Sequence, residues 1–164
     1  MDPATVFAEW KLERIPGEKL SLVASALLAE GFDVPSLKQL ASSPPSEANG
    51  DRSELLIAAM DELGLEHPSC EQAALLVAAN VARQLFAGEL STRDACADIT
   101  TIGIACHDRP DALLRFYPLL EEWELVAGID SSSLEKIDSE IRSAAKRLLE
   151  LEQAQARGSR QKSS

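Results

Sequence analysis

The sequence predicts an all-α fold, an irregular bundle of about seven to eight helices, and three observations lead to it. All eight prolines and at least six of the eight glycines lie where a helix would begin or end. Aromatic residues make up only 4% of the chain, so the core must consist mainly of Ala, Leu, Ile and Val, and Ala and Leu are strong helix formers. One segment alone, residues 99–104, has the composition of a β-strand. Because a single strand would have no pairing partner, we expect this segment to be helical as well.

The chain has 164 residues, a length that suits one domain with a sizeable core. We predict a single helical domain over residues 1–156. Within it, the segment 42–50 (SSPPSEANG) is rich in Ser and Pro and is expected to form a flexible surface loop. The basic segment 157–164 is expected to be a disordered tail.

Four helices are expected before residue 65, each bounded by proline, glycine or a capping residue. Prolines open the first three, and Asp51 or Ser53 caps the fourth. Gly31 and Gly64 follow the last apolar positions of the second and fourth helices, where glycine commonly ends a helix. The expected ranges are about 2–12, 16–30, 35–41 and 51–63.

Four more helices are expected at about 69–87, 91–106, 108–128 and 131–156. The helix at 69–87 is apolar on nearly every side from Ala73 to Ala79, which makes it the expected central helix of the bundle. In the helix at 108–128, Pro118 should cause a kink or a restart, because its ring removes a helical hydrogen bond.

The C-terminal helix is predicted to be long and amphipathic, with a cap within Ser131–Ser133. Its apolar residues form a heptad stripe over 134–151, made of Leu134, Ile137, Ile141, Ala144, Leu148 and Leu151. A stripe this narrow suits a seam between two helices, and packing of the helix on its own domain is the simpler interpretation. The stripe also leaves open a homodimer or partner seam through residues 134–151.

The formal net charge of −11 restricts the class of partner. Such a chain repels the phosphates of nucleic acids and the headgroups of anionic lipids, so we expect neither nucleic acid nor a membrane surface to bind. A protein with a basic surface is the expected partner, although the same charge can serve solubility alone. The N-terminus does not have the pattern of a secretory signal, and three irregularly spaced cysteines favour a reducing compartment, so we expect a cytoplasmic protein.

Two His–Cys pairs are the best candidates for a metal site. His67 and Cys70 would lie at the start of one helix, and Cys106 and His107 at the end of the next, where a zinc ion could take four N and S ligands. A metal-binding or enzymatic protein using these four residues is the alternative interpretation. Buried cysteines that act as small apolar residues, with two solvated histidines, explain the same residues without a metal. We therefore predict no cofactor and no catalytic residue.

Two acidic groups are the candidate contacts for a basic partner. Asp94 and Asp98 lie one helical turn apart, and Glu121, Glu122 and Glu124 form a second group. A first-turn acid that favours the helix dipole and a solvated helix face are the simpler explanations. Because nucleotide-binding and hydrolase motifs are absent from the sequence, we predict an acidic, non-enzymatic interaction protein, with an immunity-type inhibitor of a basic toxin as its most concrete form. Trp10 is the aromatic residue most open to a partner contact, because it lies on a terminal helix.

Three short elements between Pro16 and Trp123 support a family resemblance. They are D-x-P-x-L-x-x-L-A at 33–41, A-x-x-L-F-A-G-E-L at 82–90 and L-x-E-W at 120–123. Together they resemble a group of small helical bacterial proteins of actinobacterial type, for which no activity is known. The resemblance implies the all-α fold and assigns no functional residue.

Overall fold

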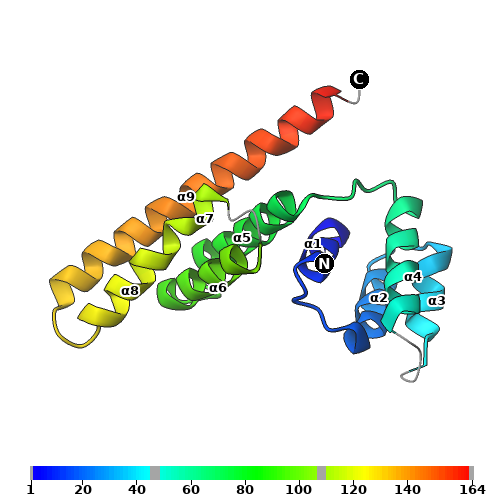
Figure 1. Ribbon diagram of the computed structural model, residues 1–164, viewed down its shortest axis with the longest axis horizontal. Helices are drawn as coiled ribbons and strands as arrows, with labels where there is room; N and C mark the ends of the chain where they lie inside the picture. Colours follow the sequence, from blue (N-terminus) through cyan, green and yellow to red (C-terminus); the bar gives the residue numbers. More distant parts are fainter. Residues whose placement is uncertain (1, 45–48, 107–109, 163–164) are drawn as a thin grey trace. The chain divides into compact units, whose positions relative to one another are not determined.

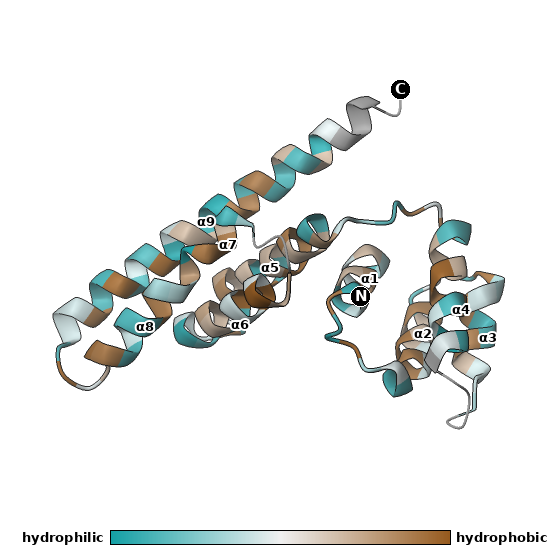
Figure 2. Cartoon of the chain, in the orientation of Figure 1, coloured by the Kyte–Doolittle hydropathy of each residue, from teal (hydrophilic) through white to brown (hydrophobic). Residues whose placement is uncertain are grey.

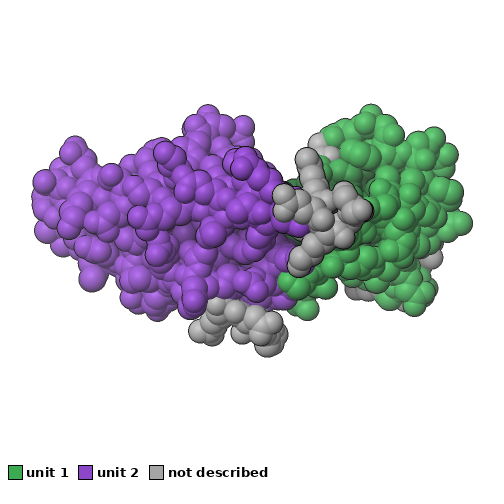
Figure 3. Space-filling model, turned by 90° about the horizontal axis from the view of Figure 1, so that it is seen from above, with its two compact units in different colours: residues 1–69 green, residues 70–164 purple. Residues whose placement is uncertain are grey.

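The computed structural model describes residues 2–44, 49–106 and 110–162, and the described residues are all-α, with no strand among them. The predicted fold class is therefore confirmed. Contacts within the chain group it into two compact units, residues 1–69 and 70–164, coloured separately in Figure 3. The sequence predicted a single domain over 1–156 instead. No described helix is both long enough and apolar enough to pass through a lipid bilayer.

Unit 1 (residues 1–69) is a bundle of short helices. They are α1 (Pro3–Lys11), the 3-10 turn η1 (Gly17–Lys19), α2 (Leu20–Ala29), α3 (Pro35–Ser42) and α4 (Asn49–Glu62), seen in blue to green in Figure 1. Helix α3 packs against both α2 and α4. The segment 42–50, predicted as a flexible loop, therefore joins two helices of one unit. Its residues 45–48 lie outside the described part of the chain, and its last two residues belong to α4.

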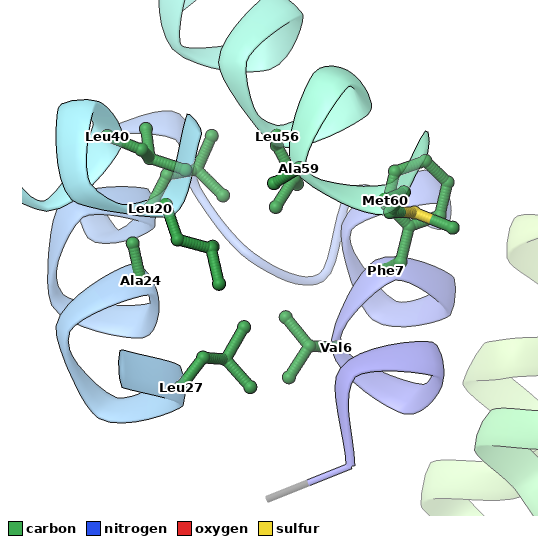
Figure 4. Close-up of a cluster of buried hydrophobic side chains, with 10 residues drawn as sticks. Val6, Phe7, Leu20, Ala24, Leu27, Leu40, Leu56, Ala59 and Met60 are labelled. Carbon is green, nitrogen blue, oxygen red and sulfur yellow. The ribbon is translucent and has the colours of Figure 1, made fainter. Parts of the chain in front are cut away.

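The core of unit 1 brings together apolar side chains from all four helices (Figure 4). Val6 of α1 and Leu27 of α2 point toward each other, and Phe7 lies beside Met60 of α4. Each of these four side chains is buried. Helices α1 and α3 begin with a proline at their first position, as the sequence predicts. Helix α2 ends before Gly31, which has a left-handed backbone conformation.

Two polar side chains also hold unit 1 together. Arg52 is only 1% exposed, and its guanidinium donates to the carbonyl oxygens of Gly17 (3.3 Å) and Pro44 (2.5 Å). Glu62 accepts hydrogen bonds from the backbone N–H of Ser36 (3.0 Å) and from its hydroxyl (2.8 Å). The first pair of bonds ties α4 to the first residue of η1 and to the segment after α3. The second pair ties the end of α4 to the start of α3.

Unit 2 (residues 70–164) contains the longer helices. They are α5 (Cys70–Ala87), α6 (Thr92–Ala105), the single turn α7 (Asp111–Leu114), α8 (Phe116–Val126) and α9 (Ser131–Lys162). Helix α5 buries side chains on most of its circumference and packs against α6 and α9, so the apolar helix predicted at 69–87 has the expected place within this unit. The strand-like segment 99–104 lies within α6 and is helical.

Helix α9 uses the heptad stripe inside its own unit. Ile137, Ile141, Ala144 and Leu148 are buried, and α9 packs on α5 and α8. Figure 2 shows hydrophobic positions recurring between hydrophilic ones along this helix. A dimer seam through the stripe would thus require α9 to leave these neighbours. The helix extends to Lys162, past residue 157, where the sequence predicted the start of a disordered tail.

Two predicted boundaries in unit 2 differ in detail. The expected restart near Pro118 falls at Phe116, which leaves the proline in the first turn of α8, where its missing N–H is not needed. The cap of α9 is Asp130 rather than one of the serines that follow. Its carboxylate accepts the backbone N–H groups of Ser132 (3.0 Å) and Ser133 (3.2 Å) and the hydroxyl of Ser133.

Candidate functional site

Helices α6 and α8 run antiparallel within unit 2 and carry the acidic residues that the sequence singled out. At one end of the pair, a Cβ added to Gly103 would lie 3.1 Å from the Cβ of Leu113 in α7, the single turn that precedes α8. At the other end, Nη2 of Arg93 lies 2.6 Å from Oε1 of Glu124. The exposed strip between these two ends is called the α6–α8 surface below.

The three glutamates of α8 do not form one cluster. Glu124 faces α6, because it binds Arg93, and Glu121 lies on the same side, because it accepts a hydrogen bond from Tyr117, which lines a pocket with α6. Glu122 is rotated from Glu121 by about 100° around the helix, away from α6. Of the predicted trio, only Glu121 and Glu124 belong to the α6–α8 surface.

The two aspartates of α6 are separated in the same way. Asp94 is in the first turn, where its backbone N–H donates to the Ser91 hydroxyl oxygen (3.1 Å) and its carboxylate accepts the Ser91 hydroxyl (2.6 Å). Ser91 is the cap of α6, and Asp94 is the first-turn acid that the sequence predicted. Asp98 is half-buried and lies about 140° around the helix from Arg93. Asp94 therefore borders the α6–α8 surface, and Asp98 does not.

Arg93 is the cation of this surface. Its Nε and Nη2 donate to Oε1 of Glu124 (3.1 and 2.6 Å), and its Nη1 donates to Oδ1 of Asp94 (3.4 Å). The hydrogen bond and the negative charge of Glu124 raise the pKa of the Arg93 guanidinium further above its usual range. Asp94 and Glu124 both bind Arg93, and Glu121 lies one helical turn before Glu124, so the described carboxylates of this surface outnumber its described arginine.

An apolar pocket of about 360 Å³ opens on the α6–α8 surface, at the end away from Arg93. It is lined by Thr100, Gly103, Ile104, Leu113, Leu114 and Tyr117. Tyr117 links the pocket to the acidic part of the surface, because its hydroxyl donates a hydrogen bond to Glu121. This interaction raises the pKa of the Tyr117 phenol. Ile104, Leu114 and Tyr117 are exposed by 57, 43 and 50% respectively, so large apolar groups surround the opening.

Comparisons of the chain with protein-family models, curated proteins and solved structures found no match. The resemblance of residues 16–123 to small helical bacterial proteins therefore stays a prediction. The functional interpretation rests on the geometry of the α6–α8 surface.

The predicted metal residues are not brought together within the described part of the chain, where no group of three His, Cys, Asp or Glu side chains could hold a metal ion. Nε2 of His67 lies 2.8 Å from Oδ1 of Asp61, and its ring packs edge-on against Phe7. Cys106 is buried and Cys70 is partly exposed. His107 lies outside the described residues. His67 thus has partners in unit 1 that explain its position without a metal.

Trp10 is half-buried rather than presented to a partner. Its ring centroid lies 4.9 Å from that of Phe7, and it packs against the core of unit 1. Tyr117, in contrast, is an exposed aromatic residue of the α6–α8 surface. Cys96, which lies below this surface, is fully buried, and burial raises the pKa of its thiol to about 11, so it stays protonated at neutral pH.

The sequence did not predict the apolar pocket. Two sequence features lie at the pocket, namely the strand-like segment 99–104, which contains Gly103 and Ile104, and the adjacent aromatic residues Phe116 and Tyr117, of which Tyr117 lines the pocket. Phe116 is fully buried, whereas Tyr117 is half-exposed, because adjacent residues of a helix point about 100° apart.

Proposed function

We propose that this chain is a non-enzymatic interaction protein whose α6–α8 surface binds a basic region of another protein. One observation carries the proposal: an apolar pocket and an excess of carboxylates meet on the same exposed strip of unit 2. Interfaces gain affinity mainly from buried apolar contacts, while complementary charge selects the partner and speeds association. The strip offers both kinds of contact within a few helical turns.

The charge of the whole chain supports the same class of partner. At a net charge of −11, the protein attracts basic surfaces over a distance of about a Debye length and repels acidic ones. An immunity-type inhibitor, which covers the basic active site of a toxin, is the most specific form of the proposal. In that form, Glu121 and Glu124 would contact the basic residues that the toxin uses to hold its substrate.

Co-purification from the native host tests the proposal. Tagged wild-type protein is compared with the double variant Glu121→Gln/Glu124→Gln at moderate salt, and the bound proteins are identified by mass spectrometry. The matched control is Glu122→Gln, which changes the same type of residue on the same helix but away from α6. We expect a basic protein to bind the wild type and the control. It should bind the double variant at least tenfold more weakly, which corresponds to a loss of about 1.4 kcal/mol of binding free energy.

Two results would contradict the proposal. The first is that no basic protein co-purifies with the wild type. The second is that a basic protein binds the double variant as well as it binds Glu122→Gln, which would place the contact elsewhere on this acidic chain. Circular dichroism of all three proteins serves as the folding control, since the substituted side chains are exposed.

A further inference from the structure

We propose that the segment bound by the α6–α8 surface is a basic α-helix with a single apolar anchor side chain, which enters the pocket above Gly103. This inference rests on the proposed function, because it specifies the partner of the same surface. The proposed function requires only a basic region on the partner. The anchored helix also requires a defined spacing between the anchor and the basic residues.

The pocket suits one large apolar side chain. Its volume of about 360 Å³ is at the small end of the range for ligand pockets in proteins. Gly103 and Leu113 are buried at its base, and three exposed apolar residues (Ile104, Leu114 and Tyr117) stand around it. An apolar anchor would cover the exposed parts of these side chains, which otherwise contact water.

The acidic residues lie at defined distances from the pocket. Along α8, Glu121 follows Tyr117 by four residues and Glu124 follows by seven, which corresponds to about 6 and about 10 Å of helix rise. Because α6 runs antiparallel to α8, Asp94 lies toward the same end of the surface as Glu124. Basic residues of a partner are therefore expected on one side of the anchor only, at these distances.

A helix meets this spacing directly. If it runs along the strip between α6 and α8, its anchor at one position is followed by Lys or Arg four and seven residues away, on the same face of the partner helix. An extended segment would cover the longer distance in about three residues. Because successive side chains of an extended chain point to opposite sides, its third residue after the anchor would point away from the strip. The surface thus favours a helical partner.

Peptide binding to the full-length protein tests this inference. The probe is an alanine-based peptide of about 18 residues, long enough to form a helix by itself, with one central leucine. Lysines four and seven residues away on both sides allow it to bind in either direction along the strip. A first control peptide replaces the leucine with alanine, and a second replaces every lysine with glutamate. Binding is followed by ¹H–¹⁵N NMR at millimolar peptide, which identifies the amides that respond.

We expect the leucine peptide to bind about tenfold more tightly than the alanine peptide, with the largest shifts at Thr100, Gly103 and Tyr117, and the glutamate peptide not to bind. Ile104→Ser should weaken binding of the leucine peptide several-fold. The matched control is Ile129→Ser, at a residue that is 82% exposed after α8 and should leave binding unchanged. Both substitutions are at exposed positions, so neither should alter folding.

The possible outcomes separate this inference from the proposed function. If the leucine and alanine peptides bind equally, if the shifts lie away from the pocket, or if no peptide binds, the anchored helix is wrong, while co-purification of a basic protein would still support the proposed function. If the purified chain is itself a dimer that Ile104→Ser dissociates, the pocket is filled by a second copy, and the inference is overturned. If no basic protein co-purifies either, the proposed function is wrong as well.

Discussion

The two units differ in where they place charge and exposed apolar surface. Unit 1 has 12 acidic and 5 basic residues, and unit 2 has 15 acidic and 11 basic residues, so unit 1 is more acidic for its size. Among the described residues, however, the large exposed apolar side chains lie almost entirely in unit 2, and Leu22 is the only one in unit 1. Net charge alone would have placed a binding surface in unit 1. We propose the binding surface in unit 2, because charge and apolar exposure are combined there.

The units also differ in how their interiors are held together. Unit 1 consists of helices of at most 14 residues and relies partly on polar bonds made by Arg52 and Glu62. Unit 2 contains α5 and α9, of 18 and 32 residues, and its described apolar core is built from Ala, Val, Leu, Ile, Phe and Cys side chains. Longer helices can bury a continuous apolar stripe, whereas short helices gain more from side chains that bond the connecting segments. Three substitutions test this comparison.

The largest effect is expected from Phe116→Ala in unit 2. Phe116 is completely buried, and removal of a buried phenylalanine costs about 3–5 kcal/mol in the free energy of unfolding. Hydrogen exchange should show lost protection in α5, α6 and α8, with little change in α2–α4. Phe86→Ala, at a 47% exposed position on α5, is the control and should have a much smaller effect. Equal loss of protection in both units would mean that they unfold together and would break the comparison.

A smaller effect, confined to unit 1, is expected from Arg52→Met. The methionine keeps much of the apolar stem but leaves the carbonyls of Gly17 and Pro44 without their donor, at a cost of about 1–3 kcal/mol. Nε of Arg52 has no partner among the described residues, so its loss offsets part of this cost. The change in the free energy of unfolding of unit 1 is measured by hydrogen exchange of the amides in α3 and α4. The control is Arg115→Met, at an exposed position in unit 2. Unchanged or increased stability of unit 1 would show that the polar bonds do not contribute.

The smallest effect is expected at Asp130, the cap of α9. Hydrogen bonds from the Ser133 hydroxyl and from the Ser132 N–H lower the pKa of the Asp130 carboxyl group. The cap therefore stabilises α9 fully at a pH above the usual aspartate pKa, and this stabilisation is lost as the pH falls through the lowered pKa. Cα chemical shifts of Ser132 and Ser133, followed from neutral pH to about pH 2, should show a small loss of helix at the acidic end.

Asp130→Asn keeps a capping oxygen but removes the titration, so these shifts should no longer depend on pH in this range. The matched control is Asp2→Asn at the equivalent cap of α1, where the carboxylate accepts the Thr5 N–H at 3.0 Å. This control should leave the response of α9 unchanged. A pH response of the α9 shifts that survives in Asp130→Asn would assign it to another group.

Helix ends were predicted well because the residues that set them act over a single turn. Pro3, Pro35, Gly64 and Ser91 each mark an observed boundary, and each acts through its own backbone or its nearest neighbours. The cap of α9 was misplaced because Asp and Ser are nearly equal in capping preference, and Asp130 directly precedes three serines. Local preference could not choose between them.

The candidate site was predicted only in part. Asp94, Glu121 and Glu124 lie on one surface, but Asp98, Glu122 and Trp10 do not share it, and the His and Cys candidates make no metal cluster among the described residues. The pocket itself depends on the close approach of Gly103 to Leu113, two residues on different helices. Although two sequence features lie at the pocket, no pattern along the chain indicates which helix faces which, so the sequence could not show that these features meet.

Composition, charge and the spacing of proline, glycine and capping residues were enough to establish a chain of acidic helices with defined ends. These properties are local or additive, and folding does not change them. The division into two units, the use of the α9 stripe within unit 2 and the meeting of a pocket with carboxylates between α6 and α8 depend on contacts between distant segments. Many pairings of amphipathic helices bury similar apolar area, and side-chain packing in three dimensions selects one of them.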